Sequence, residues 1–212
     1  MVLLTLLSIV QALALELLWS HVREADYLFG WTWMSAISWL QIGTTFLGLI
    51  LIWVVYASTA MRFRWVPTTS DSVYPFVIGL MEFVLVEVLG PDSFGLWLIA
   101  MAIIFGMMVR VSHKTMRRAR QDADNAPFFS QVGPATARDF VIQTAIVIAL
   151  ILAGLYFETT GDRGVLALLA VLATAALLLW QFVESSRFWA RSVALESEFP
   201  DSDSQDINRN SG

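Results

Sequence analysis

Two glutamates, Glu82 and Glu87, lie in an otherwise apolar stretch, GLMEFVLVEVLG at residues 79–90. An acidic side chain at the centre of a membrane helix costs about 2.5–3.5 kcal/mol on insertion scales. Protonating a glutamate with the ordinary pKa of about 4.3 costs about 3.7 kcal/mol at pH 7. Because the two costs are similar, small changes in the surroundings decide whether such a group is charged. A proton or cation pathway needs that property.

The spacing of the two glutamates argues against a shared site. They are five residues apart, so on a helix with about 100° per residue they point about 140° apart. Glu82 lies closer to the middle of the bilayer, and Glu87 lies nearer the outer interface. Other polar side chains inside apolar runs complete the transport candidates, which are Glu82, Glu87, Glu16, Gln41 and Gln143. The alternative is a Glu82 that only fixes helix packing, with Gln41 or Gln143 as its hydrogen-bond partner.

The composition indicates an integral membrane protein. Of the 212 residues, 57% are hydrophobic and 15% are charged, whereas soluble domains have about 45–50% apolar and about 25% charged residues. The apolar residues also form long runs, and a run of about 20 residues crosses the roughly 30 Å hydrocarbon core of a bilayer. The chain therefore lacks the charges that a water-facing surface would need.

Six such runs can be counted, and the connections between them are short on one side. The turn at Gly90–Ser93 joins the third and fourth runs tightly, and residues 157–164 join the last two. The sequence thus predicts an all-α integral membrane protein, a bundle of six transmembrane helices arranged as three helical hairpins within residues 1–195. The predicted spans are about 2–20, 34–57, 73–89, 94–111, 140–157 and 165–183.

The basic residues predict the orientation of these spans. Eleven of the 13 Lys and Arg residues fall in the second loop, the fourth loop and the C-terminal region, and only Arg23 and Arg163 fall on the other side. The positive-inside rule then predicts a multi-pass protein of the cell membrane with both termini in the cytoplasm. One alternative is a signal peptide cleaved after Ala12–Ala14, which leaves five spans with the same orientation. No Lys or Arg precedes that segment, which argues against cleavage.

The remaining segments suggest interfaces. The basic side chains Lys114, Arg117, Arg118 and Arg120 are candidates for binding anionic lipid headgroups, although they also serve simply as a topology signal. The acidic tail, residues 196–212, has too little apolar surface to offset its ordering entropy, so we expect disorder. Small residues at a spacing of four, Ala145, Ala149 and Ala153, predict a helix-packing ridge on the fifth span, and Ala102 and Gly106 predict one on the fourth.

Several functional classes lack support in the sequence. The chain has no cysteine and two histidines, so no metal site or cofactor is predicted, and the sequence contains no hydrolase, zinc-protease or phosphate-binding motif. Nothing suggests a nucleic-acid partner. We hypothesise a proton or small-cation channel or transporter that uses the intramembrane glutamates. The alternative is a non-catalytic scaffold or partner subunit, with the bilayer, a homo-oligomer or a membrane protein as partner. An intramembrane enzyme ranks third.

Overall fold

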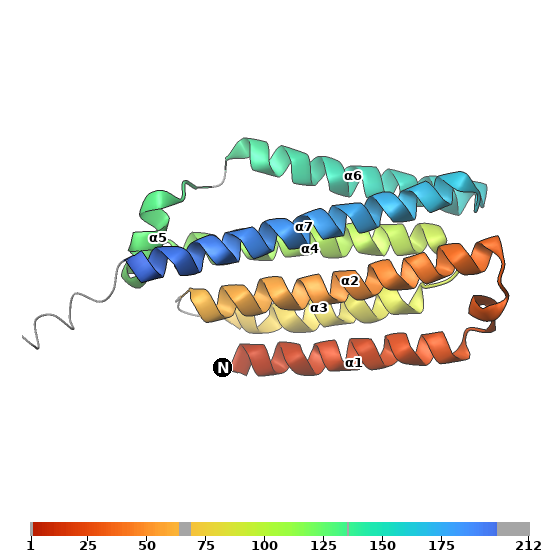
Figure 1. The fold of residues 1–212 in the computed structure, drawn as a ribbon, viewed down its shortest axis with the longest axis horizontal. Coiled ribbons are helices and arrows are strands. Elements are labelled where there is room, and N and C mark those ends of the chain that lie inside the picture. Colours follow the sequence, from red (N-terminus) through yellow and green to blue (C-terminus); the bar gives the residue numbers. More distant parts are fainter. Residues whose placement is uncertain (1, 64–68, 135, 199–212) are drawn as a thin grey trace, which may run out of the picture.

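The computed structural model describes residues 2–63, 69–134 and 136–198, and within these ranges every regular element is helical. Long helices run along one common axis and are linked by short segments (Figure 1). The elements are α1 (Val2–Glu24), η1 (Asp26–Phe29), α2 (Trp33–Arg62), α3 (Thr69–Glu87), α4 (Phe94–Ala119), η2 (Ala123–Asn125), α5 (Ala126–Gln131), α6 (Ala137–Thr160) and α7 (Val165–Glu198).

Five of these helices are long and apolar enough to cross a membrane, namely α1, α2, α4, α6 and α7. Many large apolar side chains point outward from them, such as Leu152 and Ile9, which are 61% and 55% exposed. Exposure on this scale is costly in water and favourable in lipid. The shorter α3 carries Asp71, Glu82 and Glu87 and is not among the five, so the prediction of six spans stays a prediction.

The helices that pack most extensively are not neighbours in the sequence. The main contacts join α4 with α6, α2 with α7, and α1 with α3. In Figure 1, α1 and α6 form the two edges, and α2, α3, α4 and α7 lie between them. Helices α6 and α7 spread apart from the loop that joins them, at residues 161–164. We call the end that contains this loop the Arg163 end and the opposite end the α5 end.

Most helices extend beyond the predicted spans. Helices α2, α4 and α7 continue to Arg62, Ala119 and Glu198, because their polar ends still form regular backbone hydrogen bonds. Helix α7 thus reaches three residues into the predicted disordered tail, residues 199–212 lie outside the described part of the chain, and the disorder of the tail stays a prediction. The segment between α4 and α6 contains the short helix α5, which has Pro127 in its first turn, where proline is well tolerated.

Two glycines bring α4 and α6 into backbone contact near the Arg163 end. A Cβ atom built on Gly95 would lie 2.4 Å from the Gly154 carbonyl oxygen, and one on Gly154 would lie 2.7 Å from the Gly95 carbonyl oxygen. The predicted ridge on α6 is wrong in part, because Ala145 and Ala149 are exposed. On α4 the prediction fits better, since a Cβ on Gly106 would lie 3.6 Å from Val147.

Replacing Gly154 with alanine will separate α4 from α6 and destabilise the protein by about 1–3 kcal/mol, the usual cost of overpacking. The matched control is Gly43→Ala, because nothing lies within 4 Å of a Cβ at that helical position. There the helix propensity of alanine predicts a stabilisation of up to about 1 kcal/mol. Thermal unfolding in detergent measures both variants, and equal stabilities would contradict the close crossing.

Candidate functional site

Glu82 is enclosed at the contact between α1 and α3. Its side chain is 0% exposed, and one carboxylate oxygen accepts a hydrogen bond from the Gln11 amide. The other oxygen, Oε2, has no hydrogen-bond partner. Gly79 allows this close approach, because a Cβ there would overlap the side chain of Val10. Because this carboxyl group is isolated from solvent, its charged form is costly. A proton that neutralises it, or a cation beside it, would remove that cost.

The prediction that Gln41 or Gln143 is the hydrogen-bond partner of Glu82 is wrong, because the partner is Gln11. The helices α1 and α3 pack in parallel and bring Gln11 to Glu82. The sequence contains Gln11 in an apolar run, but nothing local indicates that α1 packs against α3. Glu87 and Glu16 are exposed, so the two glutamates of α3 do not form one site, as their spacing predicts.

Gln41 belongs to a buried polar cluster at the Arg163 end. Its side-chain oxygen accepts a hydrogen bond of 3.3 Å from the backbone N–H of Gly90. Gly90 has φ +122°, a conformation that favours glycine, and it lies against the hydroxyl of Tyr27. That hydroxyl is also hydrogen-bonded to His21 at 2.8 Å. Burial, and secondarily Asp92, raises the pKa of Tyr27, so the hydroxyl stays protonated. Gln41 therefore stabilises a turn.

Arg163 joins the loop between α6 and α7 to the turn between α3 and α4. Its guanidinium donates to the carbonyl oxygens of Pro91, Asp92, Phe157 and Asp162. Glu158, on α6, accepts a hydrogen bond of 3.2 Å from the backbone N–H of Leu96 and so caps the start of α4. These contacts fix α6 to α4 at this end.

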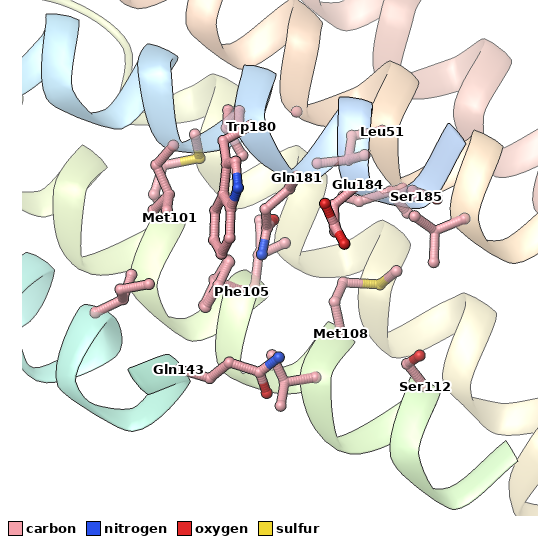
Figure 2. Close-up of a pocket in the computed structure, with 18 of the residues that line it drawn as sticks. Leu51, Met101, Phe105, Met108, Ser112, Gln143, Trp180, Gln181, Glu184 and Ser185 are labelled. Atoms are coloured by element: carbon pink, nitrogen blue, oxygen red, sulfur yellow. The ribbon is translucent and has the colours of Figure 1, made fainter. Parts of the chain in front are cut away.

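A cavity of about 470 Å³ lies farther along, between the spread helices α6 and α7, with α2 and α4 as its floor. Its size is within the range of ligand sites, about 300–1,000 Å³. Figure 2 shows Trp180 on α7 reaching toward Phe105 on α4, with Met101 and Met108 beside them. We call this cavity the α6–α7 groove. The apolar residues that form most of it include Leu51, Ile52, Met101, Phe105, Met108, Ile146, Leu150, Leu177, Leu178 and Phe188.

Polar side chains gather in the half of the groove nearer the α5 end. Gln181 and Glu184 point from α7 into the groove, and Gln143 points into it from α6 (Figure 2). Ser112 and His113 on α4 also line this half. No hydrogen bond to another described residue occupies either glutamine amide, and both are half-buried. Of the sequence-predicted candidates, only Gln143 lies in the groove.

Glu184 has one ion-pair partner among the described residues. Its carboxylate lies 3.9 Å from the Arg187 guanidinium, one turn along α7, and the two side chains are 56% and 66% exposed. An exposed pair at this distance contributes little to stability. The carboxylate is therefore available to a ligand.

Two of the four basic headgroup candidates, Lys114 and Arg120, make contacts within the protein. Lys114 donates a hydrogen bond of 3.2 Å to the Tyr74 hydroxyl and lies over that ring. Arg120 donates to the carbonyl oxygens of Phe129 and Val132 and holds the segment around α5. Arg117 is exposed, and Arg118 is half-buried. Arg120 thus has a structural role, while Arg117 stays a headgroup candidate.

The contribution of α7 to the groove was not predicted from the sequence. Thr174, Gln181 and Ser185 are seven and four residues apart and all line the groove. That spacing places polar groups on one helical face, so the sequence alone could have indicated that α7 has a polar face. The opposing residues on α4 and α6 come from other spans, so no local pattern identifies the groove.

Comparisons with known proteins identify no relative. The chain matches no protein-family model, and neither curated proteins nor solved structures gave a match. Among the described residues, no group of three His, Asp or Glu side chains is arranged to hold a metal ion.

The Gln11–Glu82 contact predicts a specific pattern of stabilities. Gln11→Leu leaves the buried carboxylate without its donor and will destabilise the protein by about 1–3 kcal/mol, as will Glu82→Leu, which leaves the amide unpaired. The double variant replaces both groups with apolar ones and will cost less than the sum of the two. Unfolding in detergent measures this cycle, and additive costs would contradict a direct bond.

Proposed function

We propose that the protein is a six-span integral membrane protein of the cell membrane, with its spans in three sequential hairpins and both termini in the cytoplasm. The distribution of Lys and Arg supports this orientation, and the helical packing of α3 within the bundle supports a sixth span. The chain has no cysteine, so single substitutions report sidedness. In intact cells an impermeant maleimide should label Asp162→Cys and spare Gln121→Cys, and the opposite result would overturn the orientation.

Within this framework the protein binds an amphipathic, lipid-like ligand in the α6–α7 groove. The observation that carries the proposal is the groove itself, which is apolar along most of its length and polar at one end. A ligand with the same division would place its chain beside Met101, Phe105 and Met108 and its polar group near Gln143 and Gln181. Methionine suits such a site because its flexible side chain adapts to a variable chain.

The groove also fits a lipid better than a small polar solute or ion. It lies between two helices whose outer faces carry exposed leucines, such as Leu152 on α6 and Leu179 on α7. An apolar chain can therefore enter sideways from the bilayer without crossing a polar barrier. An ion needs a continuous polar path, whereas most side chains that line this cavity are apolar.

Filling the groove will weaken binding. Leu177→Trp adds bulk at a lining position, and displacing about two methylenes of a bound chain, at about 0.8 kcal/mol each, predicts about a tenfold loss of affinity. The control is Leu172→Trp, the same substitution at an exposed position of α7 outside the groove. Native mass spectrometry of the detergent-solubilised protein measures retained lipid, and equal retention in the two variants would contradict the proposal.

A second candidate function, passage of protons or small cations past Glu82, has one observation in its favour. The Glu82 Oε2 atom is fully buried and without a partner, a costly arrangement that a transferable proton would relieve. Glu82→Gln should then reduce proton flux in liposomes to the protein-free level, and the groove variant Glu184→Gln should not. Unchanged flux in Glu82→Gln would remove this candidate.

A further inference from the structure

The polar half of the α6–α7 groove combines one charged side chain with several uncharged ones. Among the described residues that line the groove, Glu184 is the only Asp, Glu, Lys or Arg. Gln181 lies one helical turn from it on α7, Gln143 faces it from α6 across the groove (Figure 2), and His113 is the other titratable group among the described lining residues. A carboxylate next to amide oxygens attracts a group that is positively charged and carries several N–H donors.

A guanidinium lies directly beside this carboxylate. Arg187 is one helical turn from Glu184, with 3.9 Å between the charged groups, and both side chains are more than half exposed. A site with adjacent negative and positive groups complements a ligand with the opposite charges equally close together. Because the exposed pair gains little from its own contact, exchanging it for two contacts with such a ligand costs little.

The apolar part of the groove runs on from this charged pair. From Glu184 back to Thr174, α7 lines it over ten residue steps, which at about 1.5 Å per residue is about 15 Å. One acyl chain can follow this surface past Trp180 and Met101 while its headgroup stays at the α5 end. The lining is thus suited to a chain and a zwitterionic headgroup together.

We propose that the α6–α7 groove is a binding site for an aminophospholipid, in which Glu184 accepts hydrogen bonds from the primary ammonium group and Arg187 donates to the phosphate. This inference rests on the proposed lipid-binding function and adds the class of headgroup. Gln143 and Gln181 orient the ammonium group through their amide oxygens. A headgroup with a quaternary ammonium lacks N–H donors, and a glycerol headgroup lacks the positive charge.

Native mass spectrometry of the full chain tests this with three phospholipids that share the same acyl chains and carry ethanolamine, choline or glycerol headgroups. We expect the ethanolamine lipid to bind about tenfold more tightly than the others, the effect of one charge-assisted hydrogen bond. Glu184→Gln should reduce that preference to about twofold or less. The control, Glu16→Gln, removes an exposed carboxylate on α1 outside the groove and should keep the preference.

Three outcomes would overturn the inference. If the three lipids bind equally and Leu177→Trp still weakens all of them, the groove holds chains without selecting the headgroup, and only the further inference fails. If Glu16→Gln loses the preference as much as Glu184→Gln, the selectivity resides elsewhere. If no phospholipid binds in a manner sensitive to Leu177→Trp, the proposed function fails as well.

Discussion

The backbone contact between α4 and α6 at Gly95 and Gly154 determines where α6 lies and, through it, where the groove forms. Side chains larger than hydrogen at these positions would overlap the opposite backbone. The hydrogen bonds of Glu158 and Arg163 hold the same end of the helix pair. Because α6 is fixed to α4 there and not to α7, it diverges from α7 toward the α5 end (Figure 1). The α6–α7 groove is the space that this divergence leaves.

Polar groups in the bundle fall into two kinds of environment with different consequences. The Gln11–Glu82 pair is buried between α1 and α3, where each group is costly to leave unpaired and therefore fixes the register of the two helices. Gln143, Gln181 and Glu184 are accessible from the groove, and no hydrogen bond to a described residue occupies the two amides. The first set stabilises the protein, and the second set is suited to a ligand.

Sequence patterns predicted the helical elements well and their packing poorly. Apolar runs placed α6 within three residues of its observed limits and α7 at its observed start, and the five-residue spacing of Glu82 and Glu87 correctly separated the two carboxylates. The partner of Glu82 and the ridge on α6 were wrong, because both depend on which distant helices meet. Gln11 is 71 residues from Glu82 along the chain, and membrane helices have similar apolar surfaces on many faces, so periodicity alone does not select a neighbour.

Occupancy of the α6–α7 groove can be measured directly by site-specific crosslinking in native membranes. Met108 lies in the groove (Figure 2), and a diazirine amino acid of similar size can replace it. Our account predicts, after illumination, a mass increase equal to that of a phospholipid, and none from the same amino acid at Leu98, which is buried in the bundle and outside the groove. A polypeptide adduct at position 108 would instead indicate a partner helix in this space, and would contradict the account.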